Sequence, residues 1–242
     1  MWILFPALGA VFLILFLRER TKAPSVRAVF IKALTSVCFL GLSFCAVSRT
    51  LPAAWESGDA RTAFFPLLIL AGQLFGLLGD IWLDLKFVFP EEDKRFTNAG
   101  FVSFGVGHLL FAEALNLAFW RGDGLFWLLI PALIAVGFGI VLQPLSRKMG
   151  MDPGPFRGIT VVYGILLCFV VYFAGSLLIR SGVKSLTLWL FFSGILLFAG
   201  SDLILGGTYF GTGKDRPVHI ILNHVCYYTG QFLIAAAALA AV

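Results

Sequence analysis

Charged residues are scarce in this chain. Asp, Glu, Lys and Arg supply 13% of the 242 residues, whereas 60% are hydrophobic and the mean hydropathy is +0.95. An ordinary globular domain carries about 25% charged residues, so this composition excludes one and indicates an integral membrane protein. No polar stretch approaches the roughly 50 residues of a compact domain, so we expect residues 1–242 to form a single integral membrane domain.

Motifs that would point to other classes of protein are also missing. The four cysteines lie inside apolar runs without a Cys-x-x-Cys spacing, and we expect them to be buried small hydrophobes. The sequence has no Gly-x-Ser-x-Gly motif, which argues against a serine lipase of that type. The net charge of +5 comes from basic residues dispersed between apolar runs, so we expect no nucleic-acid partner. The first apolar run has no basic residues before it and no clear cleavage site, so we expect it to be a retained helix.

What the chain does contain is a series of long apolar segments. A membrane-spanning helix needs about 20 predominantly apolar residues, with a working range of about 17 to 25. Segments of this kind cover residues 1–17, 28–47, 64–87, 98–119, 125–142, 159–179, 186–206 and 220–241. We therefore predict an all-α, polytopic membrane helical bundle with eight transmembrane helices.

The connections between these segments differ in their Lys and Arg content. Those after the first, third, fifth and seventh segments hold twelve such residues: Arg18, Arg20, Lys22, Arg27, Lys86, Lys94, Arg95, Arg147, Lys148, Arg157, Lys214 and Arg216. The other connections hold five: Arg49, Arg61, Arg121, Arg180 and Lys184. Because cytoplasmic loops are enriched in Lys and Arg, both termini are predicted to be non-cytoplasmic.

Two aspartates lie near the ends of apolar segments in similar surroundings. Asp80 and Asp202 each follow a glycine by eight residues, Gly72 and Gly194 respectively. An ionisable side chain inside the membrane costs about 3 kcal/mol, so we expect both aspartates to be functional and to share one site in the cytoplasmic half of the bundle. A parallel duplication of four helices plus four would also produce this match. Asp84, one turn after Asp80, is expected to be an interfacial charge.

Further polar side chains fall within the apolar segments. Asn223, Tyr227 and Gln231 are spaced at i, i+4 and i+8, so they form a stripe on one face of the last helix. His108 lies near the middle of the fourth segment. Each has a structural alternative, because Gln231 could bridge two helices and His108 could bond to a backbone carbonyl.

At these residues the chain resembles the lysoplasmalogenase-like family of multipass membrane proteins, also called the YhhN-like family. The order and spacing of its motifs agree over most of the chain. The likeness is carried by Leu77-Leu-Gly-Asp80 followed by Gly107-His-Leu-Leu-Phe111, by Leu197-Phe-Ala-Gly-Ser-Asp202, by Tyr227-Tyr-Thr-Gly-Gln-Phe-Leu-Ile234, and by Tyr163-Gly164. The chain departs from the pattern at Phe111, where a tyrosine is often found.

The resemblance implies an enzyme that hydrolyses the vinyl ether bond of lysoplasmalogens. The products would be a fatty aldehyde and glycerophosphocholine or glycerophosphoethanolamine. In the family pattern the likeliest catalytic residues are the Gly-Asp and Ser-Asp aspartates, here Asp80 and Asp202. The partners would be a lysophospholipid substrate, water and membrane lipids, and neither a cofactor nor a metal is expected.

Vinyl ether hydrolysis begins with proton transfer to carbon and therefore needs an acid. One of two neighbouring buried carboxyl groups can stay protonated at neutral pH while the other is ionised. Our hypothesis is that Asp80 and Asp202 form this acid and base pair, with the order left open. Substrate or water would be bound by Tyr227, Asn223, Gln231, His108 and Tyr163. A lipid phosphate would meet one or more of the cations Lys32, Lys86, Arg157 and Arg216.

Two other functions use the same side chains. A metal-dependent membrane lipid hydrolase could take its ligands from Asp80, Asp84, His108, Asp202 and His224, although no His-x-x-x-His pair occurs. A proton-coupled small-molecule transporter could use paired intramembrane acids as a proton relay.

Overall fold

The chain is a bundle of antiparallel helices. The computed structural model describes residues 2–58, 61–120, 122, 124–211 and 216–241, and these residues contain no β-strand. The α-helices are α1 (Leu4–Arg20), α2 (Val26–Ser57), α3 (Arg61–Val88), α4 (Asp93–Phe119), α5 (Phe126–Lys148), α6 (Arg157–Arg180), α7 (Leu186–Phe210) and α8 (Pro217–Ala240). Seven of the described helices, α2 to α8, are long and apolar enough to cross a membrane. Helix α1 has 17 residues, the lower limit for a span. The all-α fold and its fit to an integral membrane protein are confirmed.

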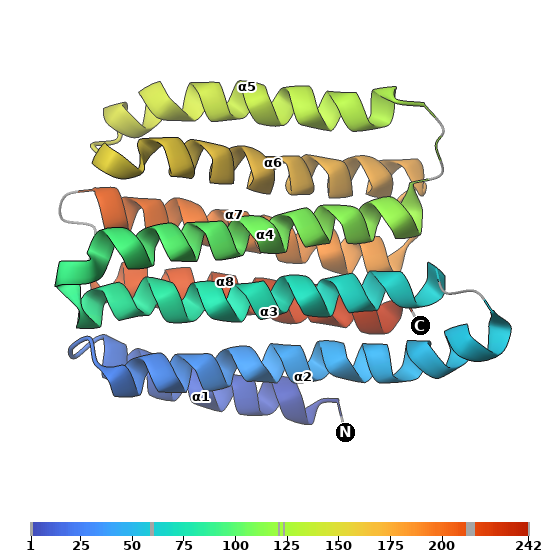
Figure 1. The fold of residues 1–242 in the computed structure, drawn as a ribbon, viewed down its shortest axis with the longest axis horizontal. Coiled ribbons are helices and arrows are strands. Elements are labelled where there is room, and N and C mark those ends of the chain that lie inside the picture. The colour runs from blue at the N-terminus through green and yellow to red at the C-terminus, as the bar shows by residue number, and fades with distance from the viewer. Residues whose placement is uncertain (1, 59–60, 121, 123, 212–215, 242) are drawn as a thin grey trace.

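Successive helices run in opposite directions, so both termini lie at the same end of the bundle (Figure 1). The C-terminal ends of α1, α3, α5 and α7 lie together at the opposite end, which is the end predicted to be rich in Lys and Arg. Arg121 and Lys214 of that comparison lie outside the described residues. Which end faces the cytoplasm stays a prediction.

The centre of the bundle is formed by α3, α4, α7 and α8. Helix α3 packs on α4, α7 packs on α8, and α3 also contacts α8. Helices α1 and α2 cover one side of this centre and α6 covers the other (Figure 1). Helix α5 lies at the outer edge and packs on α6. Most candidate site residues therefore come from the centre of the bundle, whereas Lys32 and Tyr163 come from the flanking helices α2 and α6 and α5 is peripheral.

Glycines bring the central helix pairs into close contact. A Cβ atom added to Gly194 in α7 would lie 2.7 Å from the carbonyl oxygen of Gly230 in α8, and one on Gly230 would lie 2.6 Å from that of Gly194. In α4, a Cβ atom on Gly107 would lie 2.9 Å from the carbonyl oxygen of Gly72 in α3. Small residues allow membrane helices to approach in this way. The two glycines that precede the aspartates thus make the same kind of contact with the following helix.

Helix α2 is longer than predicted. We expected it to end at residue 47, but it continues through Pro52 to Ser57. Its 32 residues span about 48 Å, more than the roughly 30 Å of the hydrocarbon core, so the last turns extend beyond the core. The apolar pattern marks only the part of a helix in hydrocarbon, which explains the difference. Ser25 caps the start of the helix, because its hydroxyl accepts a hydrogen bond from the N–H of Ala28 at 3.1 Å, and Gly58, with φ +68°, caps its end.

Candidate functional site

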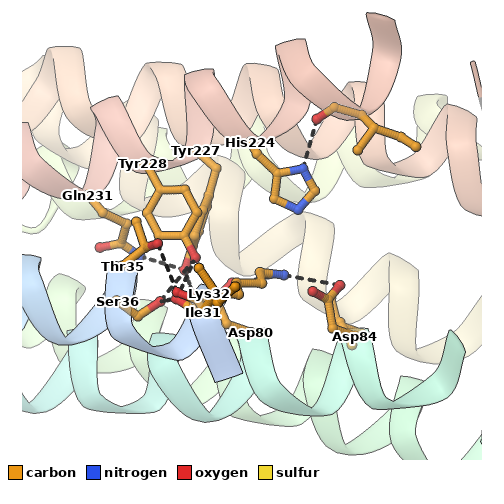
Figure 2. A network of polar contacts seen from close by, with 12 residues as sticks. Ile31, Lys32, Thr35, Ser36, Asp80, Asp84, His224, Tyr227, Tyr228 and Gln231 are labelled. Atoms are coloured by element: carbon orange, nitrogen blue, oxygen red, sulfur yellow. Dashed lines mark hydrogen bonds and ion pairs between the residues drawn. The ribbon is translucent and has the colours of Figure 1, made fainter. Parts of the chain in front are cut away.

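Asp80 lies at the meeting point of α2, α3 and α8. Only 2% of its surface is exposed, and its Oδ2 accepts hydrogen bonds from Ser36 Oγ at 2.7 Å and Tyr227 OH at 2.9 Å (Figure 2). Tyr228 OH lies 3.1 Å from Ser36 Oγ and donates to the carbonyl of Lys32 at 3.2 Å. Buried carboxyl groups need such partners, because an unpaired one is costly. We call Asp80 with these partners the Asp80 cluster.

Lys32 supplies the positive charge of the Asp80 cluster. Its Nζ lies 3.4 Å from Asp80 Oδ1 and 3.3 Å from Asp84 Oδ1, and the three side chains are almost fully buried (Figure 2). The expectation that Asp84 is an interfacial charge is wrong. Its place near the end of an apolar segment suggested the interface, whereas its surroundings are set by Lys32 arriving from α2. Lys32 is thus held between two carboxyl groups, where the sequence had suggested a contact with substrate.

The polar stripe on α8 contacts two different groups of residues. Gln231 Nε2 donates to Tyr227 OH at 3.3 Å, and both of these side chains support the Asp80 cluster. Gln73 Nε2 donates to the side-chain oxygen of Gln231 at 3.0 Å and to the backbone carbonyl of Gln231 at 2.8 Å. Asn223 instead donates to the carbonyl of Ser201 at 2.7 Å, directly before Asp202 in α7. One face of α8 therefore connects the surroundings of both aspartates.

Asp202 has a separate set of partners from α4 and α6. Its Oδ2 accepts a hydrogen bond from Tyr163 OH, and this hydroxyl also lies 3.2 Å from His108 Nε2. His108 and Tyr163 are buried, whereas Asp202 is only half-buried. We call Asp202, Tyr163 and His108 the Asp202 cluster. The structure brings together all three of these predicted site residues.

Two phenylalanines stand between the clusters. The ring of Phe198 lies 5.0 Å from that of His108 and 5.1 Å from that of Tyr227, centroid to centroid. Phe104 packs edge-on against both Phe198 and Tyr227. Hydrogen bonds hold each of the two carboxyl groups in its own cluster.

An elongated cavity of about 1000 Å³ runs between α5, α6 and α7. Asp202 and Tyr163 lie in its wall, which is otherwise mainly apolar. Asp80 is not among the described residues that line it. Ligand sites are commonly apolar cavities of about 300–1000 Å³ with a few convergent polar groups. Of the two aspartates, Asp202 is therefore the one that a ligand in this cavity would meet.

Several of these residues were not predicted from the sequence. Ser36 and Tyr228 were missed because serines and tyrosines are common in apolar segments. The spacing of Lys32 to Ser36 and of Asp80 to Asp84, each i to i+4, was a signal that could have identified two facing polar stripes. Most lining residues of α5, from Trp127 to Leu142, carry no such signal because they are apolar.

The five side chains that could have supplied metal ligands in the alternative function are dispersed. His224 Nδ1 lies 2.7 Å from the carbonyl oxygen of Ile220, and its ring packs on Phe16, while Asp84 lies beside Lys32 and His108 beside Tyr163. Within the described ranges, no three His, Cys, Asp or Glu side chains are grouped as they would be to hold a metal ion.

Comparison with known proteins gives one match. The model of the YhhN family matches residues 27–238, most of the chain and all but the first of its helices. No curated protein and no solved structure matches the chain.

Proposed function

The chain belongs to the YhhN family, and from this membership we propose that it is a lysoplasmalogenase-like hydrolase that cleaves the vinyl ether bond of lysoplasmalogens. The observation that carries the proposal is the place of Asp202, a half-buried carboxyl group in the wall of a long apolar cavity. Such a cavity fits a lipid chain, and a carboxyl group in its wall is the acid that the reaction needs.

In the proposed reaction Asp202 transfers its proton to the vinyl carbon farther from the ether oxygen. The resulting oxocarbenium ion is captured at the carbon next to that oxygen by water, which returns a proton to the Asp202 carboxylate. The hemiacetal then loses its hydroxyl proton through the carboxyl group as the carbon–oxygen bond breaks and the glycerol oxygen is protonated. One water is consumed, and a fatty aldehyde and a glycerophospho head group are released. Glycosidases use carboxyl groups around a comparable transition state.

Tyr163 and His108 are proposed to orient this acid. Tyr163 OH bonds to Oδ2 of Asp202, which leaves Oδ1 to carry the transferable proton. His108 fixes the same hydroxyl from α4. A group held in one orientation loses less entropy when it reacts, so this support raises the rate of proton transfer.

Asp80 is proposed to act on the reaction through its charge and its position. Lys32, Tyr227 and Gln231 hold Asp80 and its surroundings, while Asn223 holds α8 against the backbone beside Asp202. This refines the acid and base pair expected from the sequence. Asp202 is the catalytic residue, and Asp80 is a positioning residue that helps to stabilise the cationic intermediate.

The test is aldehyde release by the purified protein in lipid nanodiscs. A lysoplasmalogen is expected to give aldehyde, whereas the matched saturated ether lipid is expected to give none. Asp202→Asn should abolish product because an amide cannot protonate carbon, and Asp80→Asn should lower kcat. Glu91→Gln, a change of an exposed carboxyl group, is the matched control and should keep the wild-type rate.

Each variant must show a thermal unfolding transition near that of the wild type. Full activity in Asp202→Asn would remove this residue from the mechanism, and full activity in Asp80→Asn would remove Asp80. Absence of aldehyde from the wild type with every lysoplasmalogen tested would overturn the proposed function.

A further inference from the structure

Two arginines line one end of the cavity between α5, α6 and α7. Arg147 comes from the last turn of α5 and Arg157 from the first turn of α6. Beyond Asp202 and Tyr163, the wall toward the opposite end is made largely of apolar side chains such as Ile134, Leu167 and Phe192. The cavity therefore has a cationic end and a long apolar part, and Asp202 lies between them.

Helix α6 provides a scale for these positions. Arg157 precedes Tyr163, the partner of Asp202, by six residues, which corresponds to a rise of about 9 Å. The lining continues along α6 from Tyr163 to Ile179, a rise of about 24 Å. Half of the hydrocarbon core of a bilayer is about 15 Å thick, so this part is long enough for the chain of a membrane lipid. The shorter part, less than two turns of α6, is where the glycerol phosphate of such a lipid would lie.

The connection between α5 and α6 lies at the cationic end of the cavity, and the contacts of Asp152 hold it in place. Asp152 Oδ1 lies 3.7 Å from an Arg157 guanidinium nitrogen and accepts a hydrogen bond from the N–H of Gly154 at 3.0 Å. The backbone N–H of Asp152 donates to the carbonyl of Phe210 at 2.9 Å, which ties the loop to the end of α7. Because the Arg157 side chain is 45% exposed, its guanidinium group is accessible to an anion.

The other cations considered from the sequence are placed elsewhere. Lys32 is enclosed between Asp80 and Asp84. Lys86 Nζ lies 3.5 Å from an oxygen of Asp93. None of Lys32, Lys86 and Arg216 is among the described residues that line the cavity. Of the four, only Arg157 is in a position to meet a ligand that also reaches Asp202.

We propose that Arg147 and Arg157 form the phosphate subsite for a single-chain membrane phospholipid, whose chain lies along α6 toward Ile179. Guanidinium groups suit this role because they can bind a phosphate through two parallel hydrogen bonds. The placement of the scissile bond beside Asp202 rests on the proposed function, whereas the binding of the phosphate and the chain does not.

The lipid reaches the cavity from the bilayer, between α5 and α7. Helix α5 packs on α6 and α6 on α7, but α5 and α7 are not a packed pair in the described part of the chain. Leu196 and Leu203 of α7 both line the cavity and are 51% and 61% exposed. This side of the cavity thus opens on an apolar surface of the bundle.

The test is equilibrium binding of a saturated 1-alkyl lysophospholipid, which lacks the vinyl ether and so is not a substrate. The variants Arg147→Gln and Arg157→Gln are each expected to weaken binding by about tenfold or more, since a hydrogen bond to a charged group contributes about 1.5–3 kcal/mol. Lys148→Gln is the matched control because Lys148 is an exposed cation beside Arg147 and is not among the described lining residues. It should bind with wild-type affinity.

Two further ligands separate the sources of affinity. The 1-alkylglycerol without phosphate should bind more weakly to the wild type and with similar affinity to both arginine variants. Inorganic phosphate should compete only at much higher concentration than the lipid, because it lacks the chain. Equal lipid affinity in wild type and both variants, or no binding by the wild type, would overturn the subsite. Lipid binding that depends on both arginines, without aldehyde from a lysoplasmalogen, would overturn the proposed function alone.

Discussion

Lys32 shows how much of the site depends on a single buried charge. It faces two carboxyl groups, and one oxygen of Asp84 has no hydrogen-bond partner among the described residues. A buried ion pair adds little stability compared with apolar packing, but removing one partner leaves the other charge uncompensated. The lysine therefore permits two acidic side chains to lie side by side within the helices.

We predict that Lys32→Met lowers the free energy of unfolding by about 3–5 kcal/mol. Thermal or denaturant unfolding in detergent measures the change. Lys22→Met removes an exposed lysine from the connection between α1 and α2 and should have little effect.

Adding Asp80→Asn and Asp84→Asn to Lys32→Met removes the uncompensated charges and should restore part of the lost stability. If Lys32→Met were no more destabilising than Lys22→Met, the ion pairs would not be formed in the folded protein.

At the scale of helices, the glycines before the two aspartates set the point of closest contact between α3 and α4 and between α7 and α8. Gly72 with Gly107 and Gly194 with Gly230 let backbones touch, so the aspartates eight residues later are held at fixed positions relative to the next helix. Backbone atoms cannot move aside as a flexible side chain can. The contacts therefore constrain the sequence of α7 and α8 more strongly than apolarity alone does.

We predict that Gly194→Ala destabilises the protein, because its Cβ would lie 2.7 Å from the carbonyl oxygen of Gly230. Forcing α7 and α8 apart should cost about 1–3 kcal/mol, the usual range for overpacking. Gly200→Ala on the same helix is the control, since an added Cβ meets nothing within 4 Å there. The unfolding free energies of the two variants, measured side by side, should differ in this direction. Equal values would mean that α7 and α8 do not meet at Gly194.

The sequence predicted the positions of the helices better than the contacts between them. Windows of about 20 apolar residues located each helix because hydrocarbon imposes that length. The aspartates were recognisable because burying them is costly. The i to i+4 spacings in α2 and α3 indicate two polar stripes, but the pairing of Lys32 with Asp84 across them depends on the tertiary fold. The cavity was also not predictable, because it depends on α5 lying at the edge of the bundle beside α6.

For the whole molecule, the alternation of helix direction gives the bundle two chemically different ends. The end that carries the connections after α5 and α7 also holds Arg147 and Arg157. If Lys and Arg mark the cytoplasmic side, the cationic end of the cavity opens there. The orientation of the bundle would therefore decide the compartment from which the proposed head groups are bound and released.

We predict that Lys148 faces the cytoplasm and Lys184 the opposite side. Single cysteines at these exposed positions, in a variant whose four native cysteines are replaced, can be labelled with a membrane-impermeant maleimide. In intact cells Lys184→Cys should react, and Lys148→Cys should react only after permeabilisation. The reverse result would invert the topology without changing the site.

The two ends of the cavity also determine how the products of the proposed reaction would separate. Cleavage beside Asp202 would divide the lipid into a water-soluble half at the arginines and a hydrophobic half among apolar side chains. The first half would diffuse into the aqueous phase past Arg157, while the aldehyde would pass sideways into the bilayer between α5 and α7. Neither product would block the exit of the other, so turnover would not require the bundle to open. The reactive aldehyde would be released within the membrane, where a membrane-bound aldehyde-consuming enzyme would have to collect it.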